Sequence, residues 1–202
     1  MIKYIILFCV GIVILPEVVA QGFNAGIFGG VTASQVDGDS YSGPNKLGWT
    51  AGVYVNREIN YDIYWQLGIK YVTRGVYQGP TLNNYFLFGS NYGYVELPLS
   101  VHYLYNEKIQ IEAGASPEVL VTVKFWDEDG TINPSTYPEN RRFGLSVFGG
   151  IHYWFNSSIG AGVRFTYSAI PFRDPQEWNH PRYRGYFHNV ISLTGRYRFI
   201  SD

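Results

Sequence analysis

The sequence predicts an all-β protein, an eight-stranded antiparallel up-and-down transmembrane β-barrel with short periplasmic turns and long extracellular loops. Three observations predict it. Apolar and polar residues alternate with a period of two in eight segments, as in strands with two different faces. The connections between these segments are alternately long and short, which is typical of outer-membrane barrels. Aromatic residues make up 18% of the chain and there are 23 glycines, whereas only 15% of the residues are charged.

The chain opens with a segment that we interpret as a secretory signal peptide spanning residues 1–20. Lys3 precedes an apolar run from Tyr4 to Leu15, and Ala20 supplies the small residue of a cleavage site. The run is short for a membrane-spanning helix, so an uncleaved anchor is the weaker alternative. The barrel domain is expected to occupy residues 21–202. Cleavage removes Cys9, the only cysteine, and with it any disulfide or zinc–thiolate site.

Each of the eight segments supports a strand by its own alternation. They lie near residues 23–35, 46–57, 62–74, 92–105, 108–116, 142–155, 158–168 and 187–199. In chain order, their apolar faces carry Phe23, Ala25, Ile27 and Val31; Leu47, Trp49, Ala51, Val53 and Val55; Ile63, Trp65, Leu67, Ile69 and Tyr71; Val95, Leu97, Leu99, Val101 and Tyr103; Ile109, Ile111, Ala113 and Ala115; Phe143, Leu145, Val147, Ile151 and Tyr153; Ile159, Ala161, Val163, Phe165 and Tyr167; Ile191, Leu193, Tyr197 and Phe199.

The connections set the orientation of the predicted barrel. Long polar connections run near residues 36–45, 76–91, 123–141 and 171–186, and short ones lie near 58–61, 106–108 and 156–158. Turn-forming pairs such as Asp37-Gly38 and Asp129-Gly130 occur in the long ones. Because the short turns of such barrels face the periplasm, both ends of the domain are expected on the periplasmic side.

The two faces differ in a way that indicates which one points outward. The polar face is rich in glycine, serine and threonine, which suit a narrow lumen better than a solvated surface. The apolar face is aliphatic in the middle of the strands and aromatic near their ends, as in the aromatic girdles of membrane barrels. These aromatic residues are Trp49, Tyr103, Tyr105, Tyr153, Phe155, Tyr167 and Tyr197. A soluble lipocalin-like ligand carrier, with the apolar face inside, is the alternative.

Charged residues on the polar face predict a filled lumen. The inward set contains two acidic residues and four basic ones: Glu96, Glu112, Lys70, Arg164, Arg196 and Arg198. In a barrel this narrow, these charges are expected to form a network across the lumen and to block an open channel. A path for small solutes is the alternative use of the same charges.

Some sequence motifs resemble those of the PorT-like outer-membrane β-barrel family of Bacteroidetes. They are Gly26–Gln35, Asp37–Asp39, Asn45–Trp49, Tyr94–Leu99 and the closing Gly195–Phe199. The closing motif also resembles the signal by which barrel assembly machinery recognises its clients, although Ile200, Ser201 and Asp202 follow the aromatic residue. The resemblance implies a fold, insertion by that machinery and, through the family's link to type IX secretion, a partner in an envelope or secretion complex. It implies no catalytic residue.

Metal and cofactor sites are not expected. The sequence Asp127-Glu128-Asp129-Gly130 lacks the ligand spacing of a calcium-binding EF-hand loop. The inward histidines His102 and His152 are predicted near the periplasmic end and His188 near the outer end, so the three histidines cannot share a metal. With 15 basic and 16 acidic residues, the chain also lacks the basic excess of nucleic-acid-binding proteins.

Two further hypotheses concern the outer rim. A lipid-modifying enzyme would need residues such as His180 or His188 with Ser168, Asp174 or Glu177, but their spacing matches no catalytic motif. The loop near 171–186 instead offers residues for surface contacts, namely Arg173, Trp178, Arg182 and Arg184. The aromatic run from Tyr85 to Phe88 likewise fits a partner surface.

The sequence therefore predicts a non-enzymatic protein of the Gram-negative outer membrane, surrounded by outer-membrane lipid. Its expected role is that of a membrane scaffold, a surface-binding protein or a component of a secretion or envelope complex. A small-solute pore, a rim enzyme and a soluble ligand carrier are the alternatives.

Overall fold

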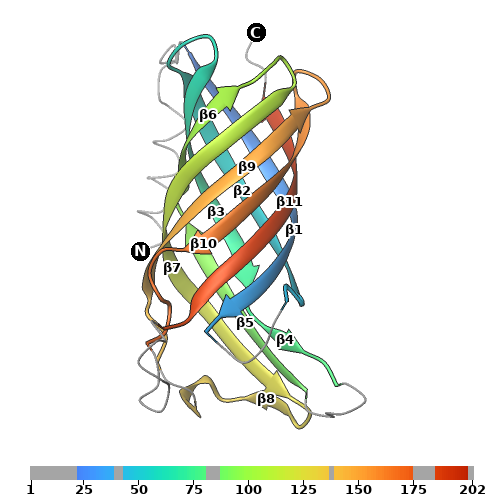
Figure 1. Cartoon of the computed structure of the whole chain (residues 1–202), viewed down its shortest axis with the longest axis vertical. Coiled ribbons are helices and arrows are strands. Elements are labelled where there is room, and N and C mark those ends of the chain that lie inside the picture. Colours follow the sequence, from blue (N-terminus) through green and yellow to red (C-terminus); the bar gives the residue numbers. More distant parts are fainter. Residues whose placement is uncertain (1–21, 39–42, 81–86, 137–138, 175–184, 200–202) are drawn as a thin grey trace, which may run out of the picture.

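A computed structural model shows a closed eight-stranded antiparallel β-barrel (Figure 1). The structure describes residues 22–38, 43–80, 87–136, 139–174 and 185–199. The predicted signal peptide lies outside these residues. No helix in the described part of the chain is long and apolar enough to cross a membrane.

Eleven strands and one short 3₁₀ turn make up the described secondary structure. They are β1 (Phe23–Asp37), β2 (Lys46–Glu58), β3 (Ile63–Arg74), β4 (Tyr77–Gln78), β5 (Phe88–Glu96), β6 (Leu99–Leu104), β7 (Ile109–Asp127), β8 (Gly130–Ile132), η1 (Pro134–Thr136), β9 (Phe143–Trp154), β10 (Ile159–Ser168) and β11 (Phe187–Phe199).

The barrel closes because every wall strand has a partner on each side. β1 pairs with β2 and β11, β2 with β3, and β7, β9, β10 and β11 follow in order. β5 and β6 together form one wall position, because both pair with β3 and with β7. They are separated at Leu97 and Pro98, and Pro98 has no N–H to donate to the ladder. Its carbonyl still accepts a 2.9 Å hydrogen bond from the Gly68 N–H.

The three periplasmic turns share an Asn-x-x-Ile sequence that begins at Asn60, Asn106 and Asn156. In each turn the asparagine Oδ1 accepts a hydrogen bond from the isoleucine N–H, at 2.9, 2.7 and 2.7 Å respectively. This is an Asx-turn, in which the side chain replaces a backbone acceptor. The isoleucine begins the next wall strand in each case, so each turn fixes the register of its hairpin.

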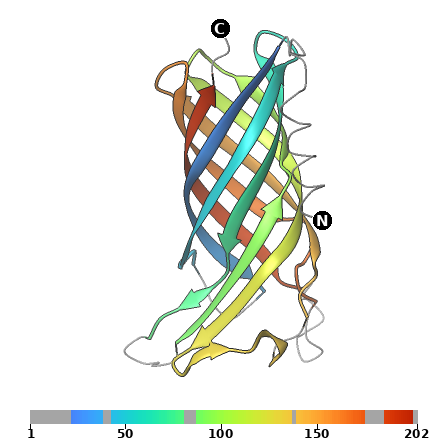
Figure 2. The same ribbon diagram turned by 180° about the vertical axis from the view of Figure 1, so that it is seen from behind.

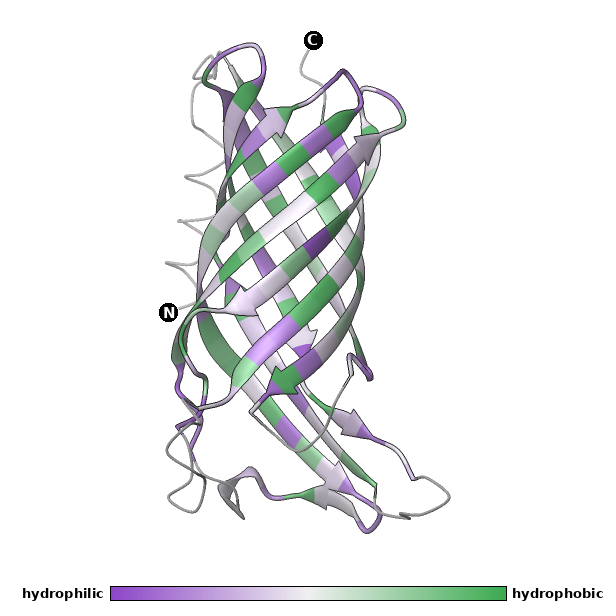
Figure 3. Ribbon diagram, in the orientation of Figure 1, coloured by the Kyte–Doolittle hydropathy of each residue, from purple (hydrophilic) through white to green (hydrophobic). Residues whose placement is uncertain are grey.

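Hydrophobic and hydrophilic residues alternate along the wall strands (Figure 3), and their exposure places the apolar residues outward and the polar ones inward. Val31, Val101 and Ile151, at the middle of three strands, are 57%, 52% and 58% exposed, whereas Thr32, His102 and His152 beside them are at most 2% exposed. Such an apolar band requires lipid around it. The structure therefore excludes the soluble ligand carrier with an apolar interior.

Two strands run further than the sequence analysis predicted. The segments predicted at 92–105 and 108–116 begin at Phe88 and end at Asp127, so parts of the predicted loops 76–91 and 123–141 are strand. The register shifts between Gly93 and Tyr94, which pair with Thr122 and Leu120, so Val121 is an additional residue in β7. This bulge changes the phase of the alternation after Leu120, so no single period-two pattern covers the whole of β7.

The extra residues form a small sheet outside the barrel (Figure 2). β7 leaves β9 after Val119 and continues against β5. β8 then pairs with β7, and β4 pairs with β5. We call these segments, β4, β8, the Phe88–Asn91 part of β5 and the Leu120–Asp127 part of β7, the outer sheet. It lies at the end opposite the short periplasmic turns.

Candidate functional site

A chain of buried ion pairs lies inside the lumen. Lys70 Nζ lies 2.9 Å from Glu96 Oε2, and Arg74 Nη2 pairs with Glu96 Oε1 and, at 2.8 Å, with Glu118 Oε2. β3 supplies both cations, whereas the carboxylates come from β5 and β7. All four side chains are at most 4% exposed.

Serine hydroxyls complete this chain. Ser146 Oγ on β9 donates a 2.6 Å hydrogen bond to Glu118 Oε2 and lies 3.4 Å from Arg74 Nη1. The guanidinium carbon of Arg74 also lies 4.3 Å from the centre of the Tyr94 ring. Charge-assisted hydrogen bonds of this kind hold both partners in fixed positions. The network joins β3, β5, β7 and β9, which occupy four consecutive positions of the wall.

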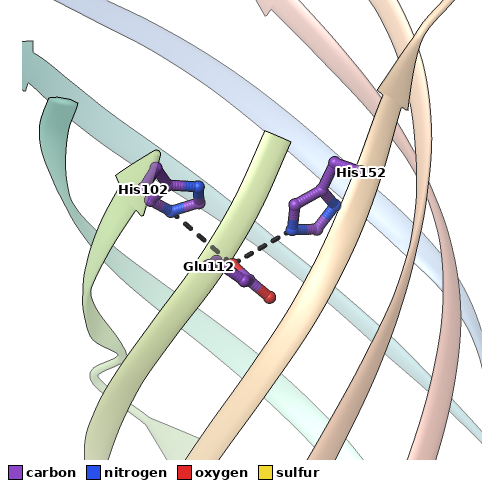
Figure 4. Close-up of side chains that lie close together, drawn as sticks. All are labelled: His102, Glu112 and His152. Atoms are coloured by element: carbon purple, nitrogen blue, oxygen red, sulfur yellow. Dashed lines mark ion pairs between the residues drawn. The ribbon is translucent and has the colours of Figure 1, made fainter. Parts of the chain in front are cut away.

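A second cluster lies closer to the periplasmic end and is centred on Glu112 (Figure 4). Arg164 binds this carboxylate with two hydrogen bonds, from Nε at 2.6 Å and from Nη2 at 2.9 Å. His152 Nε2 and His102 Nε2 lie 3.1 and 3.5 Å from Glu112 Oε2. Ser100 Oγ lies 2.9 Å from His102 Nε2. The cluster joins β6, β7, β9 and β10.

The residue types of this cluster are those of a zinc site, but the surrounding charge is not. The ligand atoms of His102, Glu112 and His152 all lie within 4.8 Å of one another, and two imidazoles with one carboxylate are common zinc ligands. However, the charge of Glu112 is already balanced by Arg164, and Arg196 lines the same cavity as His152. A divalent cation would add two positive charges beside two guanidinium groups, so the geometry favours an ion-pair role.

The remaining two residues of the predicted lumen network form no ion pair with either cluster among the described residues. Arg196 is buried and donates a 2.5 Å hydrogen bond from Nη2 to Gln66 Oε1. Arg198 lies at the periplasmic end of the lumen, where its guanidinium carbon is 4.0 Å from the centre of the Trp154 ring. The structure thus brings Lys70 to Glu96 and Arg164 to Glu112, and gives neither Arg196 nor Arg198 a carboxylate partner among the described residues.

An aromatic core closes the outer end of the lumen. Its buried members are Val36, Val72, Val76, Tyr92, Tyr94, Phe125 and Phe172. His188 stacks on Phe172 with a ring separation of 4.0 Å, and its Nε2 lies 3.2 Å from the Tyr94 hydroxyl. The core joins the outer sheet to the barrel, because it contains Phe125 of the outer sheet together with Val36 of β1 and Val72 of β3.

The rim residues predicted for surface contacts or catalysis are only partly described. Trp178, Arg182, Arg184, Glu177, His180 and the stretch 81–86 lie outside the described residues. Arg173 turns toward the aromatic core, where Nη2 donates a 3.1 Å hydrogen bond to the Tyr92 hydroxyl. Ser168 Oγ accepts a hydrogen bond from the His188 backbone N–H, and Asp174 pairs with Arg141. The described candidates therefore form no nucleophile–base pair with each other.

Arg74 and Glu118 were missed as members of the lumen network. Arg74 closes the predicted segment 62–74 on the same face as Lys70, but the predicted lumen network did not include it. Glu118 lies after Pro117, beyond the segment predicted to end at 116. A longer strand through Pro117 would have placed Glu118 inward beside Glu96, with which it pairs in register.

Comparisons with known proteins agree with this architecture. The family described as "Outer membrane protein beta-barrel domain" matches residues 19–172. No curated protein matches the chain in sequence. Among solved structures, the attachment invasion locus protein Ail of Yersinia pestis superposes with a TM-score of 0.53 at 17% identity, over 89% of this chain and 99% of that one.

Two further structures show the same fold. Ail in complex with the heparin analogue sucrose octasulfate has a TM-score of 0.51 at 16% identity, over 89% of this chain and 100% of that one. Neisserial surface protein A has a TM-score of 0.53 at 12% identity, over 89% and 98% of the two chains. At these identities the likeness concerns the fold alone.

Proposed function

The chain belongs to the outer membrane protein beta-barrel domain family, and from that premise we propose that it is a sealed membrane anchor that presents a protein-binding sheet outside the cell. The observation that carries the proposal is the outer sheet. β5 and β7 remain paired from Gly93 and Thr122 to Phe88 and Asp127, beyond the reach of β9. A barrel that served only as a membrane scaffold has no need for this extension.

The lumen supports an anchor rather than a pore. Two ion-pair clusters and an aromatic core follow one another along it, and their charged members are at most 7% exposed. An eight-stranded barrel has an interior just wide enough for its own side chains. A path for solutes would require several of these buried pairs to separate at once, at a cost of several kcal/mol each.

The outer sheet has the form of a template for strand addition. Within the described residues β8 pairs only with β7, and β4 pairs only with β5. Their other edges therefore offer backbone donors and acceptors to an extended segment of a partner. The aromatic core holds the sheet in place beforehand, which reduces the entropy that binding must overcome.

A protein partner suits this end better than a polyanion such as the heparin analogue bound by Ail. The described residues at the outer end carry nearly balanced charge. The basic ones are Lys46, Lys124, Arg141, Arg142 and Arg173, and the acidic ones are Asp37, Asp127, Glu128, Asp129, Glu139 and Asp174. This mixture creates no strong field of one sign. The resemblance of several strand motifs to PorT-like barrels supports an envelope or secretion-complex protein as the partner.

Site-specific photo-crosslinking in intact cells tests the proposal. A photoreactive amino acid is placed at Thr131 on β8 or, as the matched control, at Tyr61 in a periplasmic turn, since both side chains are exposed. We expect a discrete protein adduct at Thr131 that is absent at Tyr61. Proline at Ile132 should abolish it by removing a backbone donor from the edge strand. Equal labelling at both positions would contradict a binding role for the outer sheet.

A further inference from the structure

The buried charges of the lumen do not balance. Seven ionic side chains of the described residues are buried there, with histidines counted as neutral: the cations Lys70, Arg74, Arg164 and Arg196, and the carboxylates Glu96, Glu112 and Glu118. The cations thus exceed the carboxylates by one. A buried charge without compensation costs many kcal/mol in a medium of low dielectric constant, so a neutralising group is expected.

The excess charge resides on Arg196. The three carboxylates are taken by the other cations: Glu96 by Lys70 and Arg74, Glu118 by Arg74, and Glu112 by Arg164. The described partners of Arg196 are the Gln66 amide oxygen and the faces of the Tyr54 and Trp154 rings. All three are uncharged, and an arginine cannot discharge itself by losing its proton.

Two of the Arg196 donors have no partner within the described protein. Its Nε and Nη1 atoms are fully buried and form no hydrogen bond there, although the side chain is only 5% exposed. A buried donor without an acceptor destabilises the folded state, and more strongly when the group is charged. The guanidinium therefore requires an acceptor, and a negative one satisfies both its hydrogen bonds and its charge.

A small cavity lies beside this guanidinium. Its volume is about 10 Å³, and its lining includes Lys70, Arg164, Arg196, Thr50, Ser192 and Thr194, with no carboxylate. A volume of roughly 10–15 Å³ holds one water-sized group. The cavity thus suits one small group, and three cations are among the residues that line it.

We propose that this cavity binds a single monatomic anion, with chloride as the abundant biological example. The anion accepts hydrogen bonds from Arg196 and offsets the one uncompensated charge of the lumen. Lys70 and Arg164, which bind Glu96 and Glu112, also line the cavity and add to its positive charge. A water molecule in the same place would satisfy the donors but would leave the charge unbalanced.

Bromide soaking of crystals of the whole protein tests the site directly, because bromide replaces chloride and scatters anomalously. The expected result is an anomalous peak in the cavity, bonded to Arg196. Density in the cavity without anomalous signal would identify a water molecule and overturn the proposal. The outcome is independent of whether the outer sheet binds a partner.

Thermal unfolding in detergent separates a native site from adventitious entry of bromide. At about 0.15 M salt, the unfolding midpoint of the wild type in chloride should exceed that in gluconate of equal ionic strength by roughly 2–4 °C. Arg198→Gln should keep this difference, since Arg198 does not line the cavity, whereas Arg196→Gln should lose it. A wild-type midpoint that is the same in both salts would also refute the proposal, even if Arg196→Gln fails to fold.

Discussion

Substitution of Glu112 by glutamine tests the interpretation of the lumen as a set of mutually dependent charges. The carboxylate accepts hydrogen bonds of 2.6 and 2.9 Å from Arg164 and is 2% exposed. Removal of one member of a buried ion pair costs about 3–5 kcal/mol, because the other charge is left buried. Glutamine still offers one oxygen to Arg164, so we expect Glu112→Gln to lower the free energy of unfolding by about 3 kcal/mol.

The double variant Glu112→Gln with Arg164→Gln separates pairing from packing. If the loss of stability arises because the Arg164 guanidinium is left buried without a carboxylate, removal of that guanidinium should recover part of the free energy of unfolding. We expect a coupling energy of roughly 2 kcal/mol between the two positions. Simple additivity of the two single effects would refute this reasoning, because it would mean that each side chain acts through its packing alone.

Urea unfolding in lipid vesicles, followed by tryptophan fluorescence, measures these free energies. Glu107→Gln is the matched control, because Glu107 is an exposed carboxylate in a periplasmic turn. It should change the free energy of unfolding by no more than about 0.5 kcal/mol. A loss below about 1 kcal/mol for Glu112→Gln would contradict a buried and essential pair.

Three other predictions concern the pairing of β1 with β11, the periplasmic turns and the histidines. Gly30→Ala should lower the free energy of unfolding by roughly 1–3 kcal/mol, because an added Cβ would lie 2.0 Å from the Leu193 carbonyl oxygen. The control Gly29→Ala should be tolerated, because its added Cβ would lie 3.7 Å from the nearest atom. Equal urea midpoints for the two variants would argue against this crowding. Asn106→Ala should lower the free energy of unfolding by about 1 kcal/mol, because it removes an Asx-turn acceptor. The same urea titration measures this loss, and an unchanged free energy would contradict the role of the turn. Zinc or a chelator should leave the unfolding midpoint of the wild type unchanged, whereas a zinc-dependent rise that is lost in His102→Ala would show that the Glu112 cluster is a metal site.

The sequence predicts the barrel wall well because its faces differ in chemistry at every second residue. Lipid on one side and a narrow lumen on the other impose this alternation on all eight wall positions. The alternation fails where that constraint ends. Pro117 and Glu118 still keep the alternation, but the bulge at Val121 changes its phase, and the outer sheet no longer faces lipid. The sequence pattern therefore predicts loops where β5 and β7 in fact continue.

The side-chain contacts in the lumen depend on the shear of the barrel, which no local pattern encodes. Inward orientation of Arg196 and of Glu112 followed from the alternation alone. Their partners lie on strands distant in sequence, as the contact between Gln66 and Arg196 illustrates. Which inward residues share a level is fixed by the strand register. The Asn-x-x-Ile repeat at Asn60, Asn106 and Asn156 was visible in the sequence and would have fixed the three periplasmic turns.

Single-channel recording in planar lipid bilayers tests the central claim, that the barrel is sealed by its own side chains, most directly. The wild-type protein should insert without conductance steps in the nanosiemens range, because the pairs of Arg74 with Glu96 and Glu118 and of Arg164 with Glu112 block the lumen. Heat-modifiable mobility on a detergent gel would verify that the inserted protein is a folded barrel. Stable nanosiemens openings of that folded protein would contradict the account and identify a pore.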